Sequence, residues 1–155
     1  MVTKNGPRMH ARILMVDDEQ ATSQMLGTIL QNHGYEVDTA FCGREAIVKA
    51  ERFIPDLLVS DICKGSRNGI KAATQILEML PGCKVLFLSS QATMSEITEA
   101  VPERLVYSIA PKPLHPLDFL NVVAYMLPEA TTLENPPVVA PQRTFIETRC
   151  AGRSR

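Results

Sequence analysis

Three aspartates stand where two apolar segments of the chain end, and their positions predict a shared carboxylate site. Asp17 and Asp18 follow the run Arg-Ile-Leu-Met-Val that begins at residue 12, and Asp61 closes the run Asp-Leu-Leu-Val-Ser-Asp over residues 56–61. If both runs are parallel strands, their carboxyl ends meet at one edge of a sheet, where ligands bind in such folds. At ~4 Å two carboxylates repel by roughly 1 kcal/mol in water and about 4 kcal/mol near a protein surface, so the cluster favours a bound cation. Oxygen ligands with room for water suit Mg²⁺, and a carboxylate beside this ion can attack a phosphoryl group and carry it as an acyl phosphate.

A hydroxyl group and an ammonium group follow two further apolar runs. Ser89 is followed by Ser90 at the end of one run, and Lys112 stands between two prolines after another. At the same edge of a sheet these groups could hydrogen-bond and charge-pair with phosphoryl oxygens. Such contacts supply the electrostatic stabilisation on which phosphoryl transfer mostly depends.

Each of these residues also has a purely structural interpretation. The paired aspartates can cap a helix and favour its dipole, and Asp61 can be an ordinary loop acid. Ser89 can bond to the backbone, and Lys112 can be solvated. Suitable chemistry at four of five strand ends nevertheless favours a common site over four separate coincidences.

The segments that would position these groups alternate between strand-like and helix-like patterns. Nearly continuous apolar runs suit strands that are buried on both faces. The predicted strands cover residues 12–17, 37–40, 56–61, 84–89 and 105–109. Helical spacing of apolar residues lies between them and after the last, with a short polar helix over 93–101 and Pro116 in the first turn of the closing helix. This order predicts an α/β fold, an open, doubly wound, five-stranded parallel sheet with right-handed crossovers.

Length and composition fit one compact domain with short appendages. The chain has 155 residues, of which 45% are hydrophobic and 21% are charged, close to globular averages. We expect a flexible N-terminus over residues 1–10, a domain over residues 11–128 and a flexible, proline-containing tail over residues 129–155.

Charge and apolar patterning disfavour several classes of protein. Sixteen basic and seventeen acidic residues give a net charge of -1, which does not favour binding to nucleic acid or to an anionic membrane. Apolar stretches fall far short of the roughly 20 residues of a spanning helix and of a signal-peptide core, so we expect a cytoplasmic protein. The four cysteines and three histidines lack the spacing of a zinc site.

The sequence resembles the receiver domain of two-component response regulators over about residues 12–127. The run Ile-Leu-Met-Val-Asp-Asp-Glu at 13–19 is similar to the family's acidic pair after its first strand, and residues 56–61 resemble the phosphoacceptor strand. Residues 85–90, Val-Leu-Phe-Leu-Ser-Ser, look like the hydroxyl switch, and Lys112-Pro113 looks like the lysine–proline pair. As a set these motifs are highly specific.

The resemblance implies a flavodoxin-like receiver fold with strand order 2-1-3-4-5 and phosphoryl chemistry at Asp61. Asp61 would accept a phosphoryl group from a sensor histidine kinase or a phosphotransfer protein. Asp18, Asp61 and the backbone carbonyl of Cys63 would bind Mg²⁺ directly, with Asp17 acting through water. The protein would be a phosphoacceptor signalling domain and not an enzyme that turns over a diffusible substrate.

The resemblance also assigns roles to the other strand ends. Ser89 would turn toward a phosphoryl oxygen, and Lys112 would pair with the acyl phosphate, followed by a cis bond to Pro113. An unknown downstream protein would bind the face formed by the fourth helix, the fifth strand and the fifth helix. Because no output domain follows residue 127, we expect a stand-alone receiver or a phosphorelay intermediate.

Two positions depart from the family pattern. Gly65 stands where the family commonly has proline, and Ile109 stands where it usually has an aromatic switch residue. Tyr107 lies two residues before Ile109, on the same strand face and roughly 7 Å along the strand, so it could replace the missing ring. It could equally be a tyrosine packed at the edge of a short strand.

Other functions remain open on the sequence. A pseudo-receiver would keep the fold and bind partners without phosphate chemistry. A Mg²⁺-dependent phosphatase of the haloacid dehalogenase type needs Asp-x-Asp after its first strand, and this chain has adjacent aspartates. A dinucleotide enzyme needs a Gly-x-Gly-x-x-Gly motif after its first strand, which is missing.

Overall fold

Strands and helices alternate along the part of the chain that the computed structural model describes, residues 10–63, 67–128 and 147–150. The strands are β1 (Arg12–Val16), β2 (Glu36–Ala40), β3 (Leu57–Ile62), β4 (Lys84–Ser89), β5 (Val106–Pro111) and β6 (Glu147–Cys150). The helices are α1 (Gln20–Asn32), α2 (Gly43–Phe53), α3 (Arg67–Met79), α4 (Met94–Ala100), α5 (Pro116–Met126) and the short 3-10 helix η1 (Gln91–Thr93) before α4. The five predicted strands and five predicted helices are all present, with small shifts of their ends.

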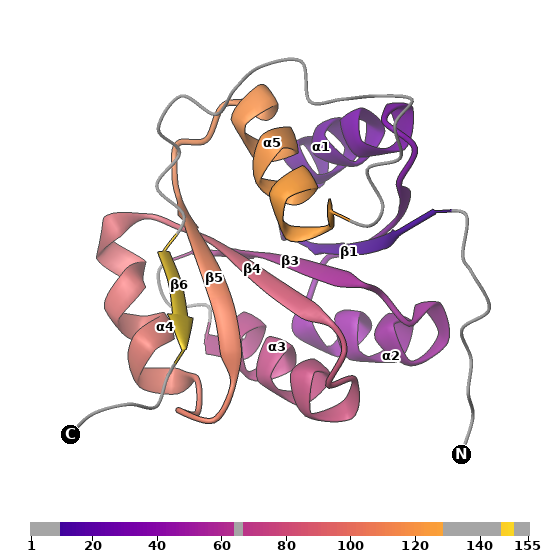
Figure 1. The fold of residues 1–155 in the computed structure, drawn as a ribbon. Helices are drawn as coiled ribbons and strands as arrows, with labels where there is room; N and C mark the ends of the chain where they lie inside the picture. Colours follow the sequence, from indigo (N-terminus) through magenta and orange to yellow (C-terminus); the bar gives the residue numbers. More distant parts are fainter. Residues whose placement is uncertain (1–9, 64–66, 129–146, 151–155) are drawn as a thin grey trace.

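The strands form one sheet in the order β2-β1-β3-β4-β5-β6 (Figure 1). The first five strands are parallel, which confirms the expected order 2-1-3-4-5. Parallel pairing places the carboxyl ends of these strands at one edge of the sheet. The predicted site residues at the ends of β1, β3, β4 and β5 therefore share this edge.

The sixth strand is a correction to the expected C-terminal tail. β6 pairs antiparallel with β5, with Cys150 opposite Val106 and Glu147 opposite Ile109. The prediction of a flexible tail is therefore wrong for residues 147–150, and the sheet has six strands instead of five. The remainder of the expected flexible segments, residues 1–9, 129–146 and 151–155, lies outside the described residues.

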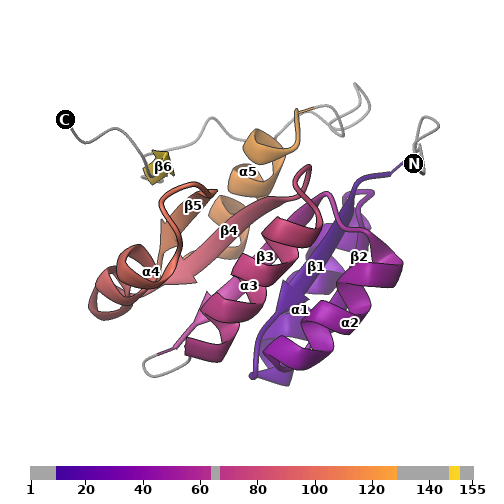
Figure 2. The same ribbon diagram turned by 90° about the horizontal axis from the view of Figure 1, so that it is seen from below.

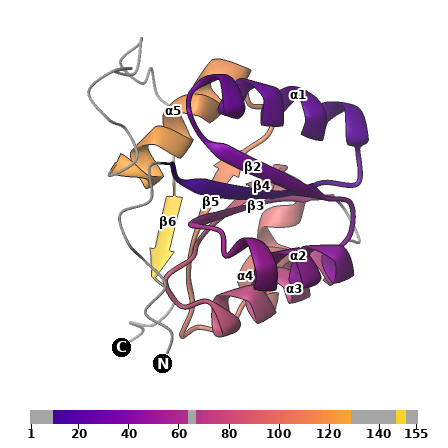
Figure 3. The ribbon, with the colours of Figure 1, turned by 90° about the vertical axis from the view of Figure 1, so that its right-hand side faces the viewer.

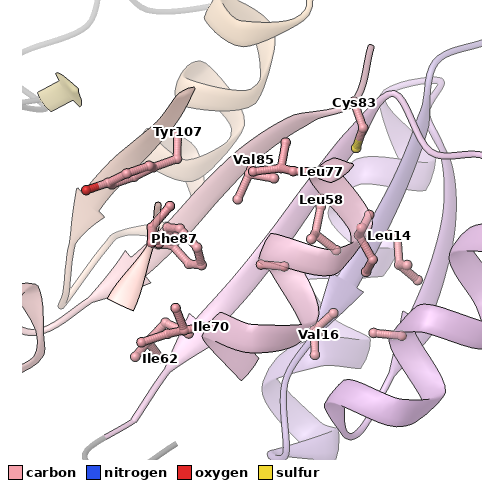
Figure 4. Packing of buried hydrophobic residues seen from close by; sticks show 14 of the residues in the cluster. Leu14, Val16, Leu58, Ile62, Ile70, Leu77, Cys83, Val85, Phe87 and Tyr107 are labelled. Carbon is pink, nitrogen blue, oxygen red and sulfur yellow. The ribbon is translucent and has the colours of Figure 1, made fainter. Parts of the chain in front are cut away.

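Two helical layers cover the sheet. Figures 1 and 3 show α1 and α5 on one face and α2, α3 and α4 on the other, and Figure 2 views the molecule from the side of the second layer. Leu57 and Val59 of β3 pack in the core under α1 and α5, whereas Leu58 and Ile62 pack in the core under α2 to α4 (Figure 4). Full burial of one such aliphatic side chain stabilises the fold by roughly 1.5–3 kcal/mol. Burial of side chains on both faces therefore stabilises the sheet between its two helical layers.

The helices end at residues that interrupt helical geometry. α1 is followed by Gly34 with a φ of 88°, a left-handed conformation that glycine adopts without strain. α5 begins with Pro116, as predicted, and the Nδ1 atom of His115 accepts a hydrogen bond from the amide of Leu117 at 3.2 Å.

None of the helices in the described ranges combines the length and the apolar character needed to cross a membrane.

Candidate functional site

The ends of four neighbouring strands meet at the predicted edge of the sheet. Asp17 directly follows β1, and Asp61 is the last residue but one of β3, which pairs with β1. Asp61 is paired with Leu88 of β4, one residue before Ser89. Ser89 is in turn paired with Pro111 of β5, which precedes the lysine. Strand pairing therefore brings together residues that are far apart in the sequence.

Asp17 is the most enclosed of the three carboxylates, with 4% of the residue exposed. Its amide donates to the carbonyl of Ala40 at 3.1 Å, and its Oδ1 atom accepts a hydrogen bond from the amide of Glu19 at 2.9 Å. The pKa of Asp17 is raised to about 6, chiefly by burial; the hydrogen bond from Glu19 opposes this shift, and the negative charges of Asp61 and Asp18 contribute to it. The influence of Asp18 and Asp61 on Asp17 places all three carboxylates in one electrostatic environment.

Lys112 supplies positive charge to this group. Its Nζ atom forms a salt bridge with Oδ1 of Asp61, and its amide donates to the carbonyl of Ser89 at 2.9 Å, which fixes the residue beside β4. Burial lowers the pKa of Lys112, but the hydrogen bond and the charge of Asp61 outweigh this effect and raise it. The ammonium group therefore stays charged at neutral pH. The bond from Lys112 to Pro113 is cis, as the resemblance implied.

Ser89 reaches the same edge, but its hydroxyl contacts η1. The residue is fully buried, and its Oγ atom lies 2.8 Å from the carbonyl oxygen of Ser90 and 2.6 Å from Oγ1 of Thr93. Thr93 is not among the residues that sequence patterns select. Its contact with Ser89 depends on the tight turn over residues 90–93, which hydrophobic periodicity does not specify.

Cys63 directly follows β3, and the charged groups of the site all affect the pKa of its thiol. Burial raises the pKa of its thiol, as does the negative charge of Asp61; the positive charge of Lys112 opposes this shift, and Asp18 and Asp17 add to it. A raised pKa disfavours the thiolate, which is the reactive form of a cysteine side chain. Because the charges of Asp17 and Asp18 affect Cys63, the end of β3 lies near both aspartates that follow β1.

The donor atoms at this edge fit a small, hard cation. Within residues 10–63, 67–128 and 147–150, no three His, Cys, Asp or Glu side chains form a group that could hold a metal ion by themselves. The Mg²⁺ site expected from the sequence needs only two direct carboxylates, Asp18 and Asp61, with the carbonyl of Cys63 and water. Mg²⁺ prefers such a set, since it keeps several waters and commonly uses one or two carboxylates. The buried Asp17 carboxylate would lie close by and gain from the added positive charge.

Tyr107 and Ile109 lie on one face of β5, because both belong to the core under α2 to α4. They are 3% and 1% exposed, and the Tyr107 ring meets the ring of Phe87 edge to face at 5.5 Å with an interplanar angle of 72°. Figure 4 shows Tyr107 beside Phe87, with its hydroxyl end directed away from the other labelled side chains. A role for Tyr107 in switching stays a prediction. Gly65, the other departure from the family pattern, lies outside the described residues.

Comparison with known proteins decides the family. The sequence profile of the response regulator receiver domain matches residues 13–124. The chain belongs to this family. The receiver is 35% identical over 94 residues to the chemotaxis protein CheY of Thermotoga maritima, a match that covers 60% of this chain and 78% of that protein. It is 36% identical over 83 residues to the alkaline phosphatase synthesis transcriptional regulatory protein PhoP of Bacillus subtilis, covering 54% of this chain and 35% of that protein.

Solved structures of receivers have the same fold. The chemotaxis protein CheY4 of Vibrio cholerae is 28% identical, with a TM-score of 0.65 over 76% of this chain and 99% of the other. A CheY-like receiver domain protein of Methanospirillum hungatei is 27% identical, with a TM-score of 0.65 over 78% of this chain and 96% of the other. The receiver fold implied by the sequence is therefore confirmed.

Proposed function

We propose that this receiver accepts a phosphoryl group on Asp61 from a sensor histidine kinase or a phosphotransfer protein, and that phosphorylation changes its binding to a downstream protein. The position of the Asp61 carboxylate carries the proposal. Its side chain is 14% exposed, so it is accessible, and it contacts Lys112 while its charge acts on Asp17. Phosphoryl transfer depends mainly on positioning and on electrostatic stabilisation, and both are available here.

The residues of the site have distinct roles in this transfer. An oxygen of Asp61 forms a bond to phosphorus while the bond from phosphorus to the partner's histidine nitrogen breaks, and the nitrogen keeps the electron pair as imidazole. Lys112, which pairs with Asp61 before the transfer, then pairs with a phosphoryl oxygen. The hydroxyl of Ser89 donates a hydrogen bond to another phosphoryl oxygen. Mg²⁺, when bound beside Asp61, supplies positive charge to the phosphoryl oxygens.

The downstream protein would bind the face formed by α4, β5 and α5. Val106, Leu117 and Tyr125 are 53%, 55% and 72% exposed on β5 and α5, and exposed apolar and aromatic side chains are common in protein interfaces. β6 runs along β5, so a partner at this face would also meet β6 (Figure 1). The sequence match covers 78% of the length of the Thermotoga maritima CheY protein and 35% of the length of the Bacillus subtilis PhoP protein. We further propose that this protein acts as a stand-alone receiver in the cytoplasm.

A labelling experiment tests the phosphoacceptor. The full chain is incubated with Mg²⁺ and acetyl phosphate, and the modified residue is located by mass spectrometry in the wild type, Asp61→Asn and Asp56→Asn. Asp56 is a matched control near the opposite end of β3, where its Oδ2 atom accepts a hydrogen bond from the amide of Arg12, which an asparagine can retain. We expect Mg²⁺-dependent labelling of the wild type and Asp56→Asn, and none of Asp61→Asn.

Two outcomes would contradict the proposal. Equal labelling of the wild type and Asp61→Asn would move the phosphoacceptor to another residue. A folded wild type that is not labelled by acetyl phosphate or by a histidine kinase would favour the alternative, a pseudo-receiver that binds partners without phosphorylation.

A further inference from the structure

The hydroxyl of Ser89 is bound to a second buried hydroxyl to which the transfer chemistry gives no role. Ser89 and Thr93 are 0% and 1% exposed, and their hydroxyl oxygens are 2.6 Å apart. Both hydroxyls also contact the carbonyl oxygen of Ser90, at 2.8 Å from Ser89 and 3.1 Å from Thr93. The end of β4 is thus tied to η1 by a compact, buried set of hydrogen bonds.

Helix capping does not account for the Thr93 hydroxyl. Thr93 immediately precedes α4, where a threonine side chain commonly accepts a hydrogen bond from an amide of the first turn. Its side chain makes no such bond, and its backbone, with φ of -103° and ψ of -5°, is helical and not extended as in a typical cap. The hydroxyl therefore serves Ser89 and Ser90 instead of α4.

We propose that Thr93 is a positioning residue that holds the Ser89 hydroxyl on η1 in the unphosphorylated receiver and so couples the start of α4 to the site. This inference rests on the proposed function. A serine hydroxyl has one proton to donate, and a phosphoryl oxygen on Asp61 would draw it away from the carbonyl oxygen of Ser90 and from the buried contact with Thr93, in which either oxygen can be the donor. When Ser89 turns to the phosphoryl group, the buried Thr93 hydroxyl loses this partner.

Loss of the hydrogen bond between Ser89 and Thr93 makes activation less favourable and affects the junction of η1 and α4. The Thr93 hydroxyl keeps the carbonyl oxygen of Ser90 at 3.1 Å but loses its shorter contact with Ser89, which is unfavourable for a buried hydroxyl unless the junction of η1 and α4 rearranges. The resting bond thus opposes binding of the phosphoryl group, because a ligand shifts an equilibrium only by its different affinity for the two states. Removing the Thr93 hydroxyl should therefore make the activated arrangement easier to reach.

The test compares variants that differ in one hydroxyl. The wild-type chain of residues 1–155, Thr93→Val and Thr93→Ser are titrated with beryllium fluoride, a phosphoryl analogue, in excess Mg²⁺, and the bound fluoride is followed by ¹⁹F NMR. We expect Thr93→Val to bind about three- to tenfold more tightly than the wild type, and Thr93→Ser to stay within about twofold of it. Thr93→Ala also removes the hydroxyl and gives the same comparison should Thr93→Val not fold.

Two controls separate positioning from general loosening. Thr98→Val makes the same chemical change within α4, where the Thr98 hydroxyl donates to the carbonyl of Met94 at 2.9 Å, and it should leave the affinity unchanged. In a Ser89→Ala background Thr93→Val should have no further effect on affinity, because the competing hydroxyl is gone. Without beryllium fluoride, the amides at the start of α4 should exchange faster in Thr93→Val than in Thr93→Ser.

The outcomes distinguish this inference from the proposed function. A wild type that does not bind beryllium fluoride with Mg²⁺ would overturn the proposed function and the inference together. A wild type that binds it, with Thr93→Val unchanged or with Thr98→Val shifted equally, would overturn the role of Thr93 alone.

Discussion

Asp17 is a buried carboxylate whose charged form becomes less favourable when the chain folds. Its pKa is raised from the ordinary value of 3.8 to about 6, chiefly by burial and in smaller part by the negative charges of Asp61 and Asp18. Between these two values the folded protein binds more protons at Asp17 than the unfolded protein does. The contribution of Asp17 to stability therefore falls as the pH rises from about 4 to about 6, and stays low at neutral pH.

Replacing Asp17 with asparagine should stabilise the protein at neutral pH. We expect Asp17→Asn to raise the free energy of unfolding by roughly 1–3 kcal/mol at pH 7.5, since one pKa unit corresponds to about 1.4 kcal/mol. The gain should nearly vanish at about pH 4, and the asparagine oxygen can keep the hydrogen bond from the Glu19 amide. Urea unfolding at both pH values with EDTA measures the difference. A larger gain at pH 4 than at pH 7.5 would contradict the assignment.

Mg²⁺ should offset the repulsion between the carboxylates of Asp17, Asp18 and Asp61. At a concentration 100 times its Kd, Mg²⁺ should add about 2.7 kcal/mol to the stability of the wild type, since it binds the folded state. Asp18→Asn should lose most of this gain if Asp18 is a direct ligand, as the proposed function requires. Thermal unfolding with Mg²⁺ and with EDTA provides the measurement, and Asp56→Asn serves as the control that keeps the gain. An equal gain in Asp18→Asn would place the ion elsewhere.

The first turn of α2 packs closely against α3. A Cβ atom on Gly43, the first residue of α2, would lie 2.8 Å from the carbonyl oxygen of Asn68 and 2.9 Å from the Cβ atom of Ala72. Both neighbours belong to α3, and one of them is backbone, so the contact can be relieved only by moving one helix. The two helices therefore require glycine at this position.

A methyl group at Gly43 should destabilise the protein. We expect Gly43→Ala to lower the free energy of unfolding by about 1–3 kcal/mol, the usual cost of overpacking. Gly82→Ala is the matched control, because a Cβ atom at Gly82 would meet nothing within 4 Å. Urea unfolding of both variants gives the comparison, and equal stabilities would show that α2 and α3 can separate without cost.

The parallel strands were predictable because their signal is local. β1, β3 and β4 are covered on both faces, so nearly every residue in them is apolar, and the breakers between them mark the ends of the helices. The polar side chains at the strand ends then predicted the edge where Asp17, Asp61 and Lys112 meet. Motif spacing was enough for this, because parallel pairing brings all the carboxyl ends to one side.

Contacts that depend on several segments at once were not predictable. The bond between Ser89 and Thr93 requires the geometry of η1, and the pairing of Lys112 with Asp61 requires the relative placement of β3 and β5. β6 was missed because its four residues, Glu-Thr-Arg-Cys, lack an apolar run. It forms through backbone hydrogen bonds to an edge strand, and these leave little trace in hydrophobic patterning.

β6 makes β5 an internal strand of the whole sheet. Val106 to Ile109 pair with residues 147–150, so backbone groups that would otherwise face outward have partners. We expect deletion of residues 147–155 to make about half of the β5 amides exchange with solvent roughly tenfold faster or more, because they lose these bonds. Hydrogen exchange measures the effect, and the amides of β2, at the opposite edge, provide the control. Unchanged protection in β5 would show that β6 does not shield it in solution.

The alternation of side chains along β4 divides the molecule into two halves. Val85 and Phe87 pack into the core below α2 to α4, whereas Leu86 and Leu88 pack into the core below α1 and α5. Ser89 continues the first series, since successive residues of a strand point to opposite faces. Movement of the Ser89 hydroxyl therefore changes contacts in the helical layer that contains α3 and α4. A protein that bound only α1 and α5 would contact the opposite layer, on the other side of the sheet from the one to which the Ser89 side chain points.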